Sequence, residues 1–302
     1  MKMTLSLSIM AFAVTMFTGC TAEKDGSTKG WFSLSEKTAE GKITQTEGEV
    51  VTKEFDIKDF TGLDIGYNTE VTYVQGNTYK VEVKTTEKVF NALRVKNKMG
   101  VLTLDFPFST PDKVKNEKIY LHVTAPQINS FELSGVTKLY AEAFTAGKLT
   151  MDVSGACKVD VGHIDCTEAD IDCSGASHIM ASIKARGEAD LECSGASTMK
   201  AKVEAKDLDL DFSGATKGDL NIISDEVDMD ISGASKIEGS FKGKRIGLEC
   251  SGTGKIDLDV DCEQLKAENS GVAKVKISGT ADDVKVNSSG VSKIDTSMLN
   301  KL

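Results

Sequence analysis

Acidic side chains occupy every second position in four stretches of this 302-residue sequence, and each stretch leads into a Ser-Gly pair. Strict alternation predicts a β-strand on which all three acidic residues share one face. If the four strands lie side by side, the carboxylates form a three-by-four grid, which we call the acidic lattice. Its members are Glu168, Asp170, Asp172, Glu188, Asp190, Glu192, Asp207, Asp209, Asp211, Glu226, Asp228 and Asp230.

Such a lattice calls for a counter-charge, because like charges on neighbouring strands destabilise a sheet. Hard divalent cations such as Ca²⁺ take oxygen ligands in adaptable geometry, so one interpretation is a weak, multi-site calcium surface. A basic patch on a partner protein is a second interpretation. A solvated face that keeps the protein soluble is the third. The sequence predicts no firm metal site and no cofactor beyond this weak calcium binding.

The remaining charged groups indicate binding more than catalysis. The twelve lattice charges exceed the net charge of −10, so the rest of the chain is close to neutral, and an acidic surface argues against nucleic acid as a partner. His122, His163 and His178 are scattered and have no matching nucleophile. A lysine stands four residues after most of the Ser-Gly serines, with acidic residues two positions further on, which indicates a solvated, mixed-charge face. We therefore expect no enzyme.

Ser-Gly pairs recur through more than half of the chain, with serines at positions 134, 154, 174, 194, 213, 232, 251, 270 and 289. The spacing is twenty residues three times and then nineteen residues five times. The positions one, three and five before each serine are mostly apolar, and a second apolar alternation follows the pair. Each repeat therefore predicts two strands joined at a corner, and the repeats together predict an all-β fold, a parallel β-solenoid of about nine coils.

The corner residues have structural interpretations. Glycine suits a corner that needs a positive φ or a close approach to the neighbouring coil. Serines stacked in one column could hydrogen-bond along the stack. Cys173, Cys193 and Cys250 stand in an apolar column, where we expect them to pack as small hydrophobic residues. A disulfide between Cys173 and Cys193 is conceivable, but we expect free thiols.

The segments outside the repeats complete the predicted organisation. Residues 49–302 form one solenoid domain, in which 131–295 are the regular coils and 49–130 an irregular cap or first coils. Strands are expected at 50–57, 63–65, 71–74, 79–83, 101–106 and 119–123, with a short helix at 87–93. The C-terminal coil has little to cover it, so an oligomer formed through coil ends is compatible with the sequence.

The first residues predict export. Lys2 precedes an apolar run that ends in Thr18-Gly19-Cys20, which resembles a bacterial lipoprotein signal. Residues 1–19 are then the signal peptide, Cys20 carries the lipid, and the polar residues 20–48 are a flexible tether. These features predict a lipid-anchored protein of the cell envelope, placed at the outer membrane, on a leaflet that the sequence does not specify.

Four stretches before the regular coils resemble the auto-transporter adhesin head GIN domain found in lipoproteins of Bacteroidetes-type bacteria. They are residues 60–65 (FTGLDI), 71–76 (VTYVQG), 100–104 (GVLTL) and 123–128 (VTAPQI), and the Ser-Gly coils follow them. The tripeptide that we associate with the family's name reads Gly66-Tyr67-Asn68 here, so its middle residue departs. The resemblance implies a right-handed parallel β-helix, a cell-envelope location and an adhesive role, and it carries over no catalytic residue.

Function is accordingly expected to be non-enzymatic: an adhesin or a binding scaffold, whose partner is a protein or a glycan. Two alternatives stay open at this point. One is a polysaccharide-active β-helix enzyme, although enzymes of that kind usually extend long loops around a cleft and the constant spacing leaves no residues for them. The other is an envelope sensor or scaffold partner.

Overall fold

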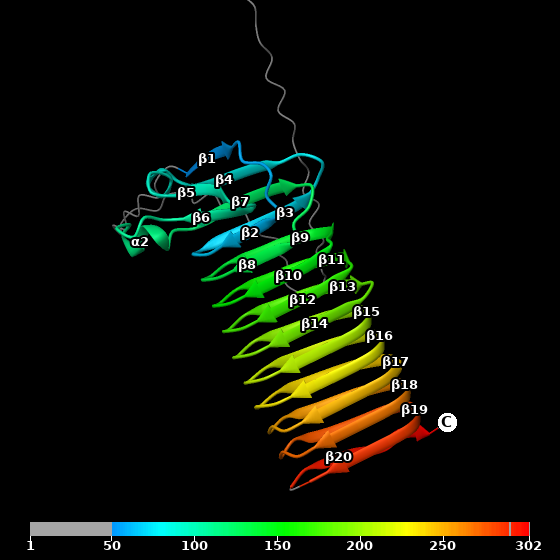
Figure 1. Ribbon diagram of the computed structural model, residues 1–302. Coiled ribbons are helices and arrows are strands. Elements are labelled where there is room, and N and C mark those ends of the chain that lie inside the picture. Colours follow the sequence, from blue (N-terminus) through cyan, green and yellow to red (C-terminus); the bar gives the residue numbers. More distant parts are fainter. Residues whose placement is uncertain (1–49, 290, 302) are drawn as a thin grey trace, which may run out of the picture. The chain divides into compact units, whose positions relative to one another are not determined.

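The computed structural model describes residues 50–289 and 291–301, and these residues form a β-solenoid of stacked parallel coils (Figure 1). Two short helices, α1 (Glu87–Phe90) and α2 (Asp112–Lys115), are its helical elements within the described residues. The predicted fold class is thus confirmed. The proposed signal peptide, Cys20 and the tether lie outside the described residues. Among the described residues, no helix has both the length and the apolar character needed to cross a membrane.

Each regular coil contributes one strand to each of two faces. Strands that lead into a Ser-Gly corner form the lattice face, and strands that follow the corner form the lysine face. The early coils have separate strands: β8 (Ser130–Leu133), β10 (Lys148–Val153), β12 (Glu168–Cys173) and β14 (Glu188–Cys193) on the lattice face, and β9 (Lys138–Thr145), β11 (Lys158–Cys166) and β13 (His178–Ala185) on the lysine face.

In the later coils one long strand bends from the lysine face onto the lattice face. These strands are β15 (Thr198–Phe212), β16 (Lys217–Ile231), β17 (Lys236–Cys250), β18 (Lys255–Asn269) and β19 (Lys274–Ser288), and β20 (Lys293–Lys301) adds a last lysine-face strand. Every strand pairs in parallel with the equivalent strand of the next coil. Equivalent residues of successive coils therefore lie side by side.

The core lies between the two faces and is filled by the predicted apolar columns. The column directly before the serines is at most 3% exposed from Leu133 through Asn269. Ile164, Ile183 and Val203 are among the residues that meet it from the lysine face, and all belong to one continuous cluster. Because one coil can bury its apolar side chains only against its neighbours, the stack and the core form together.

The glycine column confirms both predicted reasons for glycine. Gly135, Gly155, Gly175, Gly195, Gly214 and Gly233 all have positive φ. A Cβ on Gly155 would also lie 2.6 Å from the carbonyl oxygen of Gly135, a separation that real side chains do not tolerate. Gly252 and Gly271 lack the positive φ but approach the preceding coil as closely.

The serines themselves do not form the predicted hydrogen-bonded column. Among the described residues, the only serine of a Ser-Gly pair with a side-chain hydrogen bond is Ser270, which donates to the carbonyl of Cys250 at 3.5 Å. The hydroxyl three residues later has this role instead. Thr137 donates to the carbonyl of Ser134 at 2.7 Å, and Ser197 donates to that of Ser194 at 2.7 Å. This neighbouring column is buried, so its hydroxyls need a partner and find one in the corner carbonyl.

The N-terminal segment consists of short strands that stack on the first regular coil and continue the solenoid. Their bounds are β1 (Val50–Phe55), β2 (Gly62–Ile65), β3 (Thr69–Gln75), β4 (Lys80–Thr86), β5 (Arg94–Lys98), β6 (Val101–Asp105) and β7 (Ile119–Ala125). β2 and β3 pair in parallel with β8 and β9, so they form an additional coil in full register. β1 and β4 add antiparallel strands beside β7. The strands predicted at 63–65 and 71–74 correspond to β2 and β3, whereas β5 and α2 were not predicted.

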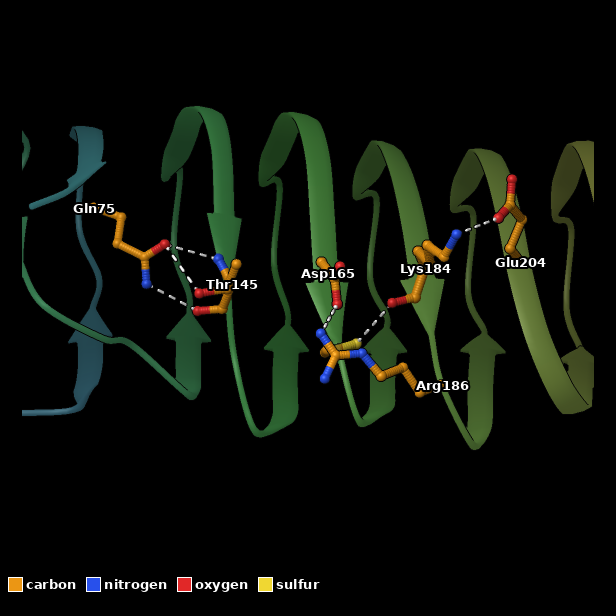
Figure 2. A network of polar contacts seen from close by, with 7 residues as sticks. Gln75, Thr145, Asp165, Lys184, Arg186 and Glu204 are labelled. Carbon is orange, nitrogen blue, oxygen red and sulfur yellow. Dashed lines mark hydrogen bonds and ion pairs between the residues drawn. The ribbon is translucent and has the colours of Figure 1, made fainter.

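Polar side chains link successive coils along the corner opposite the serines (Figure 2). Gln75 of β3 binds the first regular coil: its Nε2 donates to the carbonyl of Thr145 at 3.0 Å, and its Oε1 accepts from the amide of Thr145 at 2.9 Å. Further along, Arg186 pairs with Asp165 at 2.9 Å and Lys184 pairs with Glu204 at 3.2 Å. The Gln75 contacts fasten the irregular N-terminal coil to the regular stack, and the two ion pairs join successive regular coils.

Candidate functional site

The acidic lattice is formed as the sequence predicted, because the coils pair without a register shift along this face. The column nearest the serines runs through Asp172, Glu192, Asp211 and Asp230 as direct neighbours. The middle column runs in the same way through Asp170, Asp190, Asp209 and Asp228. The intervening residues, such as Ala169, Ile171 and Cys173, are buried, so all of the acidic side chains point away from the core.

Basic residues pair with the lattice only at its outermost column. Lys148, in the coil before the lattice, lies 3.6 Å from Glu168, and Lys206 lies 3.6 Å from Asp207. Arg245, in the coil after the lattice, forms an ion pair with Glu226. The other nine lattice carboxylates have no ion pair among the described residues. The lattice is therefore an uncompensated acidic surface with basic residues along its border.

The carboxylates of the lattice raise one another's pKa values. Burial raises the pKa of Asp172, Asp190 and Asp230, and the charges of neighbouring carboxylates add to the effect. For Glu192 the largest cause is the charge of Asp172, so here the pKa rises mainly through repulsion. All four pKa shifts have one sign because burial and neighbouring carboxylates both disfavour the ionised form. The folded chain thus holds this charge at an energetic cost.

The lattice does not gather its carboxylates into a chelating cluster. Within residues 50–289 and 291–301, no group of three or more His, Cys, Asp or Glu side chains is arranged to hold a metal ion. Parallel strands keep successive carboxylates of one column roughly 4.8 Å apart, so the oxygens form rows and do not converge on one point. The calcium hypothesis therefore stays a prediction of weak bridging between neighbouring carboxylates.

A groove of about 450 Å³ runs where the lattice face meets the serine corner in the later coils. Asp211 and Asp230 of the lattice lie along it, and Glu249 and Glu268 continue the same column beyond the lattice. Serines from the same corners, including Ser232 and Ser251, line its other side. The groove offers hydroxyl and carboxylate oxygens to a ligand that follows the stack.

The lysine face differs from the lattice because three lysines of its column pair with neighbouring carboxylates. Lys158 lies 3.6 Å from Asp160, Lys236 lies 2.8 Å from Glu238, and Lys255 lies 3.5 Å from Asp257. The lysines form the predicted column, with His178 and Thr198 interrupting it. These pairs fit the predicted interpretation of a solvated, mixed-charge face.

The cysteines of the described residues are buried free thiols. Cys173 and Cys193 are direct neighbours on adjacent coils and are not joined by a disulfide. Burial raises the pKa of Cys166 to about 11 and that of Cys262 to about 11, so both stay protonated at neutral pH. These properties fit packing of small apolar side chains and not redox chemistry.

Sequence analysis missed one polar pocket, which lies at the corner between β2 and β3. Gly66 and Tyr67 occupy the positions that Ser134 and Gly135 occupy one coil later. The pocket has a volume of about 570 Å³ and combines residues from four separate segments. Its only signal in the sequence was the tripeptide Gly66-Tyr67-Asn68, which lacks the Ser-Gly pair that marks every other corner.

Comparisons with known proteins agree with this architecture. The sequence profile of the family described as "Putative auto-transporter adhesin, head GIN domain" matches residues 59–238 and 226–301. No curated protein matches the chain.

Solved structures of low sequence identity share the fold. A structure described as a putative adhesin from Parabacteroides distasonis is 14% identical, with a TM-score of 0.64 over 82% of this chain and 98% of that one. A second, described as a putative adhesin from Parabacteroides merdae, is 16% identical, with a TM-score of 0.57 over 83% and 97%. A third, described as a putative lipid binding protein from Parabacteroides distasonis, is 16% identical, with a TM-score of 0.52 over 83% and 97%.

At these identities the structures establish the shared solenoid and nothing of their ligands. The family profile matches most of the chain, and the coils, the N-terminal strands and the solved structures agree with it. This chain belongs to the auto-transporter adhesin, head GIN domain family.

Proposed function

We propose that this protein is a non-enzymatic, adhesin-type binding protein of the cell envelope, and that the acidic lattice is its contact surface for a basic partner. The observation that carries the proposal is the set of nine carboxylates that lie in register, point outward and have no ion pair among the described residues. Burial and the charges of neighbouring carboxylates raise the pKa values of Asp172, Asp190, Glu192 and Asp230, so part of this charge is held at an energetic cost. A partner that brings positive charge relieves this cost on binding.

The regularity of the coils supports binding over catalysis. Between residues 131 and 288 each coil continues directly into the next, so the described faces consist of strand side chains in straight columns. A catalytic site needs different groups that converge on one reacting atom. Repeated identical groups are suited instead to multivalent contact, in which many weak interactions add up.

A basic partner fits the lattice better than a bound metal. Lysine and arginine side chains are long and adjust individually, so each can reach a separate carboxylate in a row. A Ca²⁺ ion needs six to eight oxygens around one point, and the described residues have no such cluster. Weak calcium binding then competes with the partner for the same carboxylates.

Membrane attachment through Cys20 completes the proposal. The signal-like residues 1–19 and the cysteine that follows them support lipidation, and the family's description as adhesins supports the envelope and the outer membrane as its place. The test is fractionation of cells that express the chain or Cys20→Ser. We expect the unmodified chain to fractionate with the outer membrane and to enter the detergent phase. The Cys20→Ser variant should remain in the soluble fraction. Equal partition of the two would contradict lipid anchoring at Cys20.

The lattice is tested with two variants of equal charge change. The central-column variant carries Asp170→Asn, Asp190→Asn, Asp209→Asn and Asp228→Asn. The lysine-face variant carries Asp160→Asn, Asp219→Asn, Asp257→Asn and Asp295→Asn, which removes four carboxylates from the opposite face. Both variants keep the size and shape of the side chains, so they differ only in where the charge is lost.

Binding to fluorescent poly-L-lysine, with poly-L-glutamate as the control polymer, is then measured at low and high NaCl. We expect the unmodified chain to bind poly-L-lysine with an affinity that falls as salt rises. The central-column variant should bind at least about tenfold more weakly, which is 1.4 kcal/mol, and the lysine-face variant should bind as well as the unmodified chain. Equal losses in both variants would show that net charge is responsible and not the lattice.

A further inference from the structure

The corner between β2 and β3 differs from the Ser-Gly corners of the regular coils in both residues of the pair, with Gly66 at the serine position and Tyr67 at the glycine position. Tyr67 has a φ of +66° where the equivalent residues of the next six coils are glycines. Its carbonyl accepts a hydrogen bond from the amide of Val136 at 2.7 Å, so it continues the corner ladder. A left-handed conformation costs a residue with a side chain about 1–2 kcal/mol. The fold tolerates this strain at a corner that adjoins a pocket.

The pocket exists because the regular stack is interrupted at this point. On one side of the corner lies Gly135 of the next coil, as elsewhere in the solenoid. On the other side the chain leaves β6 at Asp105 and returns at β7 only at Ile119, after an excursion that includes α2. Because no tight corner covers Gly66 and Tyr67 from that side, a volume of about 570 Å³ stays open.

The pocket is lined by polar groups and one aromatic residue. Tyr67 is half-buried and its ring packs edge-on against Phe106, with ring centroids 4.9 Å apart. The polar lining includes Asp64, Asn68, Lys98, Asp105 and Asn116, together with Ser134 from the next coil. Gly66 contributes no side chain, and a Cβ at this position would come within 2.8 Å of the Ser134 hydroxyl.

Hydrogen bonds hold the lining in place. Asn68 Nδ2 donates to the carbonyl of Asn116 at 3.0 Å, which joins the corner to the end of the excursion. Lys98 lies 3.7 Å from Asp105, so these two charges balance each other. Asp64 has no ion pair among the described residues, and it leaves the pocket with a net negative charge.

We propose that this corner pocket between β2 and β3 binds an uncharged sugar ring, with Tyr67 and Asp64 as the residues that contact it. A volume of this size is within the range of small-ligand sites, roughly 300–1,000 Å³. Carboxylate oxygens, amides and a hydroxyl arranged around one space can accept from and donate to the neighbouring hydroxyls of a sugar. The aromatic side chain supplies an apolar surface for the C–H groups of the ring. The unpaired Asp64 disfavours anionic ligands such as phosphates or acidic sugars.

This site is independent of the acidic lattice, because it belongs to the non-repeating coil. It would give the protein a specific contact beside the non-specific electrostatic one. Failure of either proposal leaves the other standing, since different residues and different probes test them.

The test is saturation-transfer difference NMR on the full chain in detergent, with methyl glycosides of glucose, galactose, mannose and N-acetylglucosamine at millimolar concentration. We expect transfer to the ring protons of at least one of these glycosides. Asp64→Asn and Tyr67→Gly should each weaken binding about tenfold or more, as expected for a charged hydrogen bond or a stacking contact removed. Tyr140→Ala, which removes an aromatic side chain from the lysine face, and the central-column variant should bind like the unmodified chain.

Several outcomes would overturn the proposal. One is the absence of transfer to all four glycosides. Another is transfer that both Asp64→Asn and Tyr67→Gly leave unchanged, which would place the sugar elsewhere. A third is binding of methyl glucuronide in place of the neutral glycosides. Thermal unfolding of each variant shows whether it folds, and Asp64→Asn keeps the side-chain shape if Tyr67→Gly proves unstable.

Discussion

At the scale of single residues, the corner glycines of the solenoid have the least freedom to change. Gly195 has a φ of +70°, and a Cβ there would lie 2.5 Å from the carbonyl oxygen and 3.0 Å from the amide nitrogen of Gly175. Both obstructing atoms belong to the backbone of a paired coil, so neither can rotate away. Conformation and close approach thus act together at one position.

We expect Gly195→Ala to destabilise the folded chain by about 2 kcal/mol or more, because the left-handed conformation alone costs about 1–2 kcal/mol. Gly147→Ala is the matched control, since the nearest atom to a Cβ there is 3.8 Å away. Denaturant unfolding of both variants measures the difference. If the two variants lose the same free energy of unfolding, the close approach is not what requires glycine at the corner.

At the scale of strands, the lattice face combines a well-packed inner side with a repelling outer side. Val227, Met229 and Ile231 of β16 are each at most 2% exposed, while Asp228 and Asp230 between them face solvent. Packing of the buried columns fixes the register of the strands, so the carboxylates stay side by side despite their mutual repulsion. The repulsion is therefore imposed by the core and should respond to pH.

The pH dependence of stability should reveal this repulsion. The folded-state pKa values of Asp172, Asp190, Glu192 and Asp230 are raised, so their ionised forms destabilise the folded state at neutral pH. As the pH falls through these raised pKa values, protonation removes the destabilising charge, so the chain should become more stable. The central-column variant should gain less stability over the same fall in pH, because four of the repelling charges are absent. At pH 7 this variant should unfold about 2–4 °C higher than the unmodified chain. Thermal unfolding followed by circular dichroism measures both effects, and the lysine-face variant should not be stabilised. A lower unfolding temperature for the central-column variant at pH 7 would mean that the carboxylates stabilise the fold.

The junction between the irregular and the regular coils depends on Gln75. Its amide group makes four hydrogen bonds, to the carbonyls of Pro126 and Thr145 and from the amide and hydroxyl of Thr145. Gln75→Glu removes both donors and places a negative charge against two carbonyls, so we expect a loss of about 1–3 kcal/mol.

Hydrogen exchange at the Thr145 amide should increase in Gln75→Glu, because this amide donates directly to Gln75. Gln127→Glu is the control: Gln127 makes a single side-chain hydrogen bond, to Asn129 at 2.9 Å. Unchanged protection of Thr145 in Gln75→Glu would mean that strand pairing alone holds the junction.

At the scale of the whole solenoid, the coils are interchangeable units, because each contacts mainly its two neighbours. β15 and β16 pair along fourteen residue positions with one register, and β16 and β17 repeat the pattern. Stability in such a stack is close to a sum of coil and interface contributions. A change in coil number should therefore be tolerated where a change within a coil is not.

Deletion of residues 195–213 removes nineteen residues and joins Ser194 to Gly214, which restores a Ser-Gly corner. We expect this shorter chain to fold with unchanged β-structure per residue and a modest loss of stability. Deletion of residues 195–204 joins Ser194 to Ala205 and places lysine-face residues on the wrong side of the stack, so we expect it to unfold. Circular dichroism and limited proteolysis distinguish the two. If both deletions unfold, the coils are not independent of their sequence context.

The sequence by itself determined the features that repeat. In a parallel stack with constant coil length, each residue lies beside its equivalent in the next coil, so columns of an alignment become columns in space. That is why the buried cysteine positions, the glycine corner and all twelve lattice carboxylates could be placed from spacing alone.

Only the tertiary structure decided the features that do not repeat. Tyr67 and Gly135 are adjacent corners, yet 68 positions separate them in the chain and the first lacks the serine-glycine signal. Nothing local to Gly66-Tyr67-Asn68 shows that β6, the end of α2 and the next coil close around it. The hydrogen bonds of the hydroxyls three residues after each corner serine, such as those of Thr137 and Ser197, were likewise decided by the tertiary structure. Their acceptors are carbonyl groups that become buried only when the coils stack. Periodic spacing encodes contacts between equivalent residues, whereas contacts between unlike segments arise only when the chain is packed.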